Sequence, residues 1–344
     1  MKKRQPTPVP AAEPVQGALR VSHWTITNGS GMHRVAESLV DAERAIGLDS
    51  ILCDPSKSET WPDSYTADVH VCHTHIPSRI KEYATKPYRV VWVGHGTPEH
   101  VVELSVQEAE GGAYGHGDGV QLLLHWLREA DARVTFWDRH KWIYDRYLTK
   151  GARPTDCVPL GVDLSFWADP VPSRGKFAGE PSIFTAENPH RIKWPLDTYW
   201  LWPAITDEFT EARLHSIYMP KDLHRVFFPL VDGNSTAFTS YITPTVFDKE
   251  GLRNAFRSTD YTLGLVRYGD INHLSLQAAA AGAKTISYRG NPYASFWITE
   301  GDQREMANEL LAILRGDVAP RVIPPIPDVS DSAKAMSLIY SEIL

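Results

Sequence analysis

The sequence predicts an α/β protein built from two doubly wound parallel sheets. Short apolar runs that end in polar or glycine-rich turns alternate with segments of helical periodicity. This alternation occurs in both halves of the chain, and a stretch rich in proline, glycine and charge separates them near residues 168–180. The runs are continuously apolar, as expected for parallel strands covered by helices on both faces. The pattern therefore predicts two Rossmann-like domains that face each other across a cleft.

The composition agrees with a globular protein of two domains. The 344 residues are 42% hydrophobic and 22% charged, and their formal net charge of −7 disfavours nucleic-acid binding through bulk charge. Three cysteines without CxxC spacing cannot all pair, which favours a reducing, cytoplasmic compartment. Residues 1–17 are proline-rich, lack the apolar core of a signal peptide, and are expected to form a flexible tail. No later stretch is apolar enough to predict membrane insertion.

The first predicted domain covers residues 18–167 and opens with a strand, a loop and a helix. The strand lies at residues 18–24, and the loop TITNGSG follows it. The helix begins near residue 32, because its apolar residues recur at the spacing of one buried face, and it ends at Gly47. Asn28 and Gly31 give the loop little bulk at the carboxyl edge of the sheet, where ligands bind in such folds.

Further strands are expected at residues 50–53, 68–72, 89–93 and 132–136, with helices at 120–129 and 141–148. The third of these strands leads into Gly94, His95, Gly96 and Thr97. Its two glycines allow a substrate to approach His95 closely, although a structural histidine that fixes the loop is an equally good interpretation. His73 and His75 alternate at a neighbouring strand end and so point to opposite sides. With no Asp-x-Asp in the chain, the sequence predicts no metal site.

The second predicted domain covers residues 168–328, and residues 329–344 are expected to form a closing helix. Strands are expected at 182–185, 214–218, 237–242 and 261–266, with helices at 249–257 and 302–315. Pro195 suits the first turn of another helix. Arg191 and Lys193 precede it and could converge on one anion at the helix start, although two solvated cations are the common alternative.

An alanine-rich segment is the most distinctive part of the second half. A strand is followed by a polar turn, then by a helix containing four consecutive alanines at 278–281, and Gly282 suits the helix stop. Free backbone N–H groups at the start of this helix would suit a phosphate. An ordinary buried crossover helix is the alternative. The turn and first helical position carry Gly269, Asp270, Asn272 and His273.

Several segments, in this order, resemble the retaining GT-B glycosyltransferases of family four. They include SGMHRVAESLVDAERAIG, VWVGHGTP, CVPLGVDLSFW, FTAENPHRIKWPLD and HLSLQAAAAGAKTIS, and the resemblance covers residues 18–298. It implies a GT-B fold and transfer of a sugar from a nucleotide-sugar donor with retention of anomeric configuration. It also implies that no metal ion and no cofactor other than this co-substrate is required.

The resemblance also implies roles for individual residues. His95 would lie beside the donor sugar as the catalytic residue, and Gly31 would lie near the phosphates. Lys193 would hold the diphosphate, with Arg191 supplying a second charge, and Gln277 would hold the ribose. Backbone groups of the alanine-rich turn would complete the donor site, at Gly269, Asp270, Asn272 and His273. The acceptor is expected near Asn28, His33, Arg34 and Thr97.

The chain departs from this family where the family has two glutamates, because Gly269 and Gln277 stand in their place. An amide can still hydrogen-bond a ribose hydroxyl, whereas glycine cannot orient a sugar. Two alternatives therefore stay open: a catalytically degenerate protein that binds a nucleotide or glycan, and a nucleotide-sugar epimerase of the same fold. A soluble acceptor is favoured, and a small molecule, glycan, protein or modified nucleic-acid base would fit.

Overall fold

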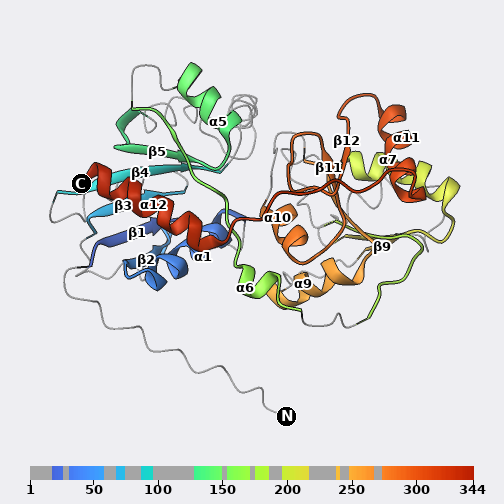
Figure 1. Ribbon diagram of the computed structural model, residues 1–344, viewed down its shortest axis with the longest axis horizontal. Helices are drawn as coiled ribbons and strands as arrows, with labels where there is room; N and C mark the ends of the chain where they lie inside the picture. Colours follow the sequence, from blue (N-terminus) through green and yellow to red (C-terminus); the bar gives the residue numbers. More distant parts are fainter. Residues whose placement is uncertain are drawn as a thin grey trace, which may run out of the picture.

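The part of the chain that the structure describes forms two six-stranded, fully parallel sheets joined by a short connection (Figure 1). The computed structural model describes residues 18–25, 31–57, 67–73, 87–95, 128–148, 153–170, 175–185, 196–216, 238–240, 248–266 and 273–344. The strand orders are β2-β1-β3-β4-β5-β6 and β12-β11-β10-β7-β8-β9. The predicted pair of doubly wound parallel sheets is therefore confirmed.

The strands of the first sheet are β1 (Arg20–Trp24), β2 (Asp49–Cys53), β3 (Val69–Cys72), β4 (Arg89–Gly94), β5 (Ala132–Thr135) and β6 (Asp156–Cys157). Those of the second are β7 (Ser182–Thr185), β8 (Arg213–Ser216), β9 (Phe238–Ser240), β10 (Tyr261–Gly264), β11 (Thr285–Tyr288) and β12 (Phe296–Ile298). Around them lie α1 (Gly31–Ala45), α5 (Asp138–Ile143), the π-helical turn η2 (Tyr144–Leu148), α6 (Leu164–Trp167), α7 (Leu196–Glu208), α9 (Lys249–Ser258), α10 (His273–Ala280), α11 (Gln303–Arg315) and α12 (Val329–Ile343).

Most predicted elements occur within a few residues of their expected bounds. The short elements β6, α6 and β12 were not expected from the sequence. The helix predicted at 141–148 begins three residues earlier and ends as the π-helical turn η2. Most of the predicted helix 120–129 lies outside the described residues. The predicted domain boundary at residue 168 falls between the last strand of the first sheet and the first strand of the second, and it stays a prediction.

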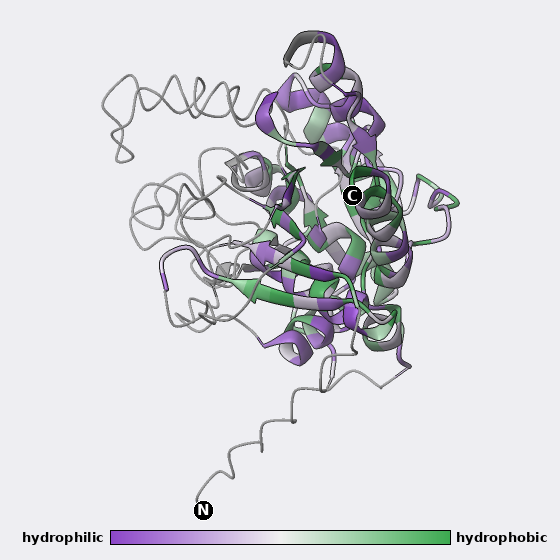
Figure 2. Ribbon diagram, turned by 90° about the vertical axis from the view of Figure 1, so that its left-hand side faces the viewer, coloured by the Kyte–Doolittle hydropathy of each residue, from purple (hydrophilic) through white to green (hydrophobic). Residues whose placement is uncertain are grey.

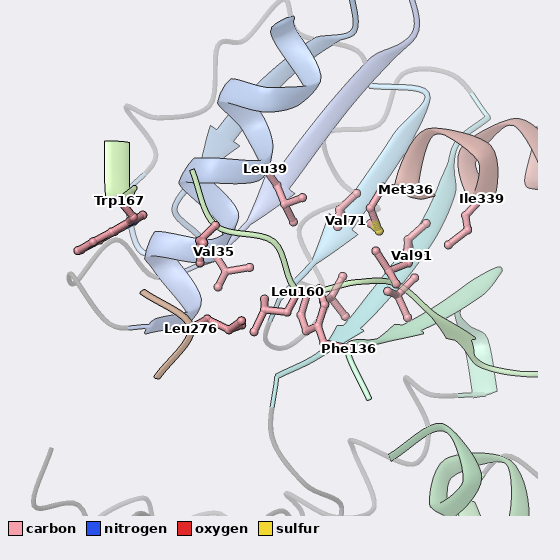
Figure 3. Packing of buried hydrophobic residues seen from close by; sticks show 14 of the residues in the cluster. Val35, Leu39, Val71, Val91, Phe136, Leu160, Trp167, Leu276, Met336 and Ile339 are labelled. Carbon is pink, nitrogen blue, oxygen red and sulfur yellow. The ribbon is translucent and has the colours of Figure 1, made fainter. Parts of the chain in front are cut away.

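Apolar strands lie inside the molecule and more polar helix surfaces lie outside, as the hydropathy colours show (Figure 2). One cluster of buried apolar side chains runs from the first sheet into the second domain. Leu160 and Trp167 connect the two parts, and Figure 3 shows Leu276 of α10 directed toward Leu160. The start of the second domain's alanine-rich helix is thereby held close to the first sheet.

The final helix, α12, crosses back to lie on the first domain, where it packs against α1 (Figure 1). Its start is fixed by Asp328, whose carboxylate accepts hydrogen bonds from the backbone N–H groups of Ser330 and Leu164. The connecting chain lies so close that a Cβ on Gly161 would stand 2.3 Å from the backbone oxygen of Asp328. This tight crossing requires glycine at position 161.

Candidate functional site

The candidate site lies where strands β1, β3 and β4 end at one edge of the first sheet. Parallel neighbours bring their carboxyl ends to the same edge, and the register pairs Trp24 with Cys72 and Cys72 with Trp92. His73 directly follows β3 and His95 directly follows β4. Both histidines therefore lie at this edge, close to the start of α1.

Three histidine rings are joined in a line that leads inward from His95. Nε2 of His95 lies 2.7 Å from Nδ1 of His73, and Nε2 of His73 lies 2.9 Å from Nδ1 of His23. His95 is half-buried, whereas His73 and His23 are buried. The rings of His23 and His73 stack with their centroids 5.2 Å apart, and the rings of His73 and His95 lie tilted with their centroids 4.9 Å apart.

The line ends at Glu43 of α1, a carboxylate with no exposed surface. Nε2 of His23 lies 2.8 Å from Oε2 of Glu43, and the same oxygen accepts a hydrogen bond from Ser50 Oγ at 2.6 Å. The other oxygen, Oε1, accepts a hydrogen bond from the Tyr340 hydroxyl of α12 at 2.7 Å. Every oxygen of this buried carboxylate is thus hydrogen-bonded, as a charge in the protein interior requires.

The electrostatics favour an ionised Glu43 and a neutral His95. Burial acts to raise the pKa of Glu43, but His23 and the hydroxyls of Ser50 and Tyr340 lower it by more. Burial is also the main reason that the pKa of His95 is lowered to about 3, with the charge of His273 as a second cause. The pKa of His73 is lowered well below its ordinary value, first by burial and then by His95 and His23.

The charge of His273, the first residue of α10, lowers the pKa of His95 at the edge of the first sheet. Helices α1 and α10 are in contact, and both begin near this edge. Within α10, Nε2 of Gln277 lies 3.2 Å from Nδ1 of His273. Gln277 is only 4% exposed, so this contact holds its side chain along the helix. The site therefore combines a strand end from one domain with a helix start from the other.

Comparison with known proteins gives matches in structure alone. No protein-family model matches the sequence, and no curated protein does. Among solved structures, sucrose-phosphate synthase from Thermosynechococcus elongatus aligns with a TM-score of 0.65 and 12% identity, over 94% of this chain and 96% of that one. The lipopolysaccharide outer core galactosyltransferase WaaB, in its apo form, aligns with a TM-score of 0.61 and 14% identity, over 94% and 100%. HepE of Anabaena, solved in complex with UDP-glucose, aligns with a TM-score of 0.60 and 10% identity, over 94% and 98%.

The chain has the GT-B fold. The architecture implied by the sequence resemblance is therefore confirmed across nearly the whole chain. In this GT-B protein, His95 and His273 come from the two different domains.

The described residues include only some of the side chains predicted for the site. Gly31 is the first residue of α1 and is exposed, and His33 and Arg34 in its first turn are half-buried. His95, His273 and Gln277 lie at the interface of the two domains, as set out above. The other predicted site residues lie outside the described part of the chain: Asn28, Thr97, Arg191, Lys193, Gly269, Asp270 and Asn272.

Three groups of this site, His23, His73 and Glu43, were not among the residues predicted for it. A signal for Glu43 was present, because it lies three and four residues after Val40 and Leu39 and so continues the apolar face of α1. A carboxylate at such a position requires a buried partner. His23 gave a weaker signal, since a single histidine within a short strand has many structural explanations.

The described residues hold no group of three or more His, Cys, Asp or Glu side chains placed to bind a metal ion. The three histidines and Glu43 form a line and do not converge on one point. Within the same part of the chain, every helix is too short or too polar to cross a bilayer. The arrangement is suited to holding protons in fixed positions at the domain interface.

Proposed function

We propose that the protein is a glycosyltransferase that moves a sugar from a nucleotide-sugar donor to an acceptor with retention of configuration and without a metal ion. One observation carries the proposal: α10, which begins at His273, packs against α1 beside the sheet edge where His95 follows β4, and the charge of His273 lowers the pKa of His95. In GT-B proteins this interface is where the sheets present their carboxyl ends to one another, and ligands of open α/β sheets bind at such ends.

The chemistry of transfer fits a site of this kind. Negative charge grows on the departing diphosphate in the transition state, so cations and aligned N–H groups must surround it. We assign this role to Arg191 and Lys193, together with the backbone of residues 269–273 at the start of α10. Gly31 would line the phosphates from the first domain, and Gln277 would contact the ribose.

The acceptor would bind to the first domain near the start of α1. We assign Asn28, His33, Arg34 and Thr97 to its contacts, and His95 to the space between donor sugar and acceptor. HepE, whose solved complex holds UDP-glucose, supports a nucleotide-sugar as the donor class. The free Cys53 and Cys72, both buried, support a reducing cytoplasmic compartment.

A thermal-shift screen of nucleoside diphosphates and their sugars tests donor binding. We expect one donor to raise Tm in the wild-type protein and to lose this effect in Lys193→Ala, because a ligand that binds only the folded state stabilises it. Lys334→Ala is the matched control, since the Lys334 side chain is exposed on α12 and pairs only with Asp331 among its described contacts. If no nucleotide or nucleotide-sugar raises Tm at millimolar concentration, this result would contradict the proposal.

A degenerate binding protein is the second candidate, and one observation favours it. Gln277, in place of a glutamate, is buried and its amide contacts His273 within the same helix. This candidate predicts a thermal shift by the donor without transfer and without slow donor hydrolysis. An epimerase of the same fold would instead convert the donor to its epimer with no acceptor present.

A further inference from the structure

The line of histidines ends in a pair of opposite charges inside the first domain. Glu43 is ionised and has no exposed surface, and its Oε2 lies 2.8 Å from Nε2 of His23, which is equally buried. A charge in the interior is costly unless an opposite charge lies beside it. The other partners of this carboxylate, Ser50 and Tyr340, are hydroxyls, and burial together with Glu43 raises the pKa of Tyr340 well above its ordinary value. His23 therefore supplies the positive charge, as an imidazolium.

An imidazolium at this end fixes the direction of every hydrogen bond in the line. It has two N–H donors and no acceptor, so His23 donates Nε2–H to Glu43 and Nδ1–H to Nε2 of His73. His73 is neutral, because burial, followed by the interactions with His95 and His23, lowers its pKa well below the ordinary value. A neutral ring whose Nε2 accepts carries its proton on Nδ1, so His73 donates Nδ1–H to Nε2 of His95. By the same rule, the neutral His95 carries its proton on Nδ1.

The line uses Nε2 of His95 and leaves its Nδ1–H for a ligand. His95 is half-buried, and no described residue accepts a hydrogen bond from its Nδ1. An N–H group can only donate, so its partner must be an acceptor atom. In the proposed site His95 lies beside the donor sugar, whose hydroxyl oxygens are acceptors of this kind.

We propose that the buried ion pair of His23 and Glu43, acting through His73, fixes His95 as a hydrogen-bond donor to a hydroxyl oxygen of the donor sugar. This proposal rests on the proposed transferase function. No covalent bond changes and no proton moves along the line. His73, His23 and Glu43 are positioning residues, because they act only through His95.

The line gives a reason for burying so many titratable groups behind one strand end. A neutral histidine alone can carry its proton on either nitrogen, and the hydrogen bond made by one nitrogen decides which form the other presents. With Nε2 held as an acceptor by His73, His95 has one ring orientation and one proton position before the donor binds. Such preorganisation lowers the cost of binding the sugar.

Nuclear magnetic resonance of the full-length, ¹⁵N-labelled protein tests the direction of the line without any substrate. At pH 7 we expect both ring nitrogens of His23 to be protonated, and only Nδ1 to be protonated on His73 and His95. A His23 ring with a single proton, or a His95 ring with its proton on Nε2, would overturn the proposal. This measurement uses the wild-type protein and so stands even if every variant fails to fold.

The variant Glu43→Gln tests the ion pair. It keeps the shape of the side chain and removes the negative charge, so we expect His23 to hold one proton in place of two. A His23 ring that stays doubly protonated in this variant would show that Glu43 does not set the charge of the line.

The variant His73→Phe tests the contact with the sugar. It breaks the line next to His95 and keeps a buried aromatic ring, so part of the His95 population should move its proton to Nε2. By titration calorimetry, the affinity for the nucleotide-sugar should fall by about five- to tenfold, the size of one hydrogen bond. The affinity for the nucleoside diphosphate, which has no sugar, should stay unchanged. Equal losses for the two ligands would overturn the proposal.

The matched control is His70→Phe, which replaces a buried histidine of β3 that bonds Ser22 and Trp24 and lies outside the line. It should leave the His95 signals and both affinities unchanged. If it has the same effect as His73→Phe, the loss is structural and the proposal is wrong. If no nucleotide-sugar binds the wild-type protein but the proton positions are as expected, the transferase function and the sugar contact fail together, and the ion-paired line stands.

Discussion

Glu43 shows how one side chain connects three parts of the molecule. Its carboxylate lies on α1, accepts hydrogen bonds from β1 and β2 through His23 and Ser50, and accepts another from α12 through Tyr340. Each of these is a charge-assisted hydrogen bond in a site without solvent, where such bonds are strong and an unmade one is costly. The residue therefore contributes both to the candidate site and to the attachment of the last helix.

The substitution Tyr340→Phe should lower the free energy of unfolding by about 1.5–3 kcal/mol, because it removes one hydrogen bond to a buried charged group. Tyr261→Phe is the matched control. The Tyr261 hydroxyl lies at 3.5 Å from the Ile313 carbonyl, so its loss should cost less than about 0.5 kcal/mol. Urea unfolding measures both values. Equal losses in the two variants would contradict the role of Tyr340.

His140 should make the protein less stable in acid. Both of its ring nitrogens are buried without a hydrogen-bond partner among the described residues, and burial lowers its pKa to about 3. Below the unfolded-state pKa near 6.5, the unfolded chain binds a proton that the folded chain does not, so stability falls with falling pH. His140→Phe removes this effect.

We therefore expect His140→Phe to gain about 2 kcal/mol over the wild-type protein between pH 7.5 and pH 5. Urea unfolding of both proteins at the two pH values provides the measurement. A stability difference that stays constant between the two pH values would show that folding does not lower the pKa of His140.

Among individual residues, His95 could be predicted from the sequence as a site residue. The signal for Glu43 was also present, but it was not recognised. The histidines at strand ends could be placed at one edge from the parallel topology alone. Their joining into a line could not, because it depends on side-chain directions and on the contact of His23 in β1 with His73 just after β3, which are 50 residues apart in the chain.

The start of helix α12 is held in place by a few hydrogen bonds. Asp328 caps it through Ser330 N–H, and its second oxygen also accepts a hydrogen bond from Leu164 N–H at the start of α6. Ser332 adds hydrogen bonds to the backbone of Gly161 and Pro159. This junction ties the closing helix to the connection between the domains.

Asp328→Ala should lower the free energy of unfolding by about 2 kcal/mol, because it removes one cap and leaves a second helix start without its partner. Asp302→Ala removes the cap of α11 alone, through Arg304 and Glu305 N–H, and should cost about 1 kcal/mol. Urea unfolding compares the two. A smaller loss for Asp328→Ala than for Asp302→Ala would contradict the double role.

Gly31→Ala separates a structural from a functional role at the start of α1. A Cβ at Gly31 would meet no described atom within 4 Å, and alanine favours a helix, so Tm should not fall. If Gly31 lines the donor phosphates as proposed, the same methyl group should weaken donor binding by about tenfold or more. Titration calorimetry with the donor measures this, and unchanged affinity would remove Gly31 from the donor site.

Elements with strong periodicity could be predicted, and those set by tertiary contacts could not. The apolar spacing of α1 and the glycine at its end gave its bounds closely. The closing helix expected at residues 329–344 occurs as α12, Val329–Ile343. β12 was missed because it has three residues, too few for an alternating pattern to emerge.

At the scale of the whole molecule, the two parallel sheets and the apolar cluster that they share bring the end of strand β4 close to the start of helix α10. The repeated pattern of strands and helices sufficed to predict this architecture. The cluster through Leu160, Trp167 and Leu276 explains why α10 lies against the first domain.

Turnover of a nucleotide-sugar is the measurement that tests the central claim most directly. Each donor stabilising the protein is incubated with it, with and without candidate acceptors, and the released nucleoside diphosphate is quantified. We expect release from one donor, slow with water and faster with an acceptor, and its loss in Lys193→Ala but not in Lys334→Ala. A donor that binds the wild-type protein and yet releases no nucleoside diphosphate under any condition would contradict the transferase assignment.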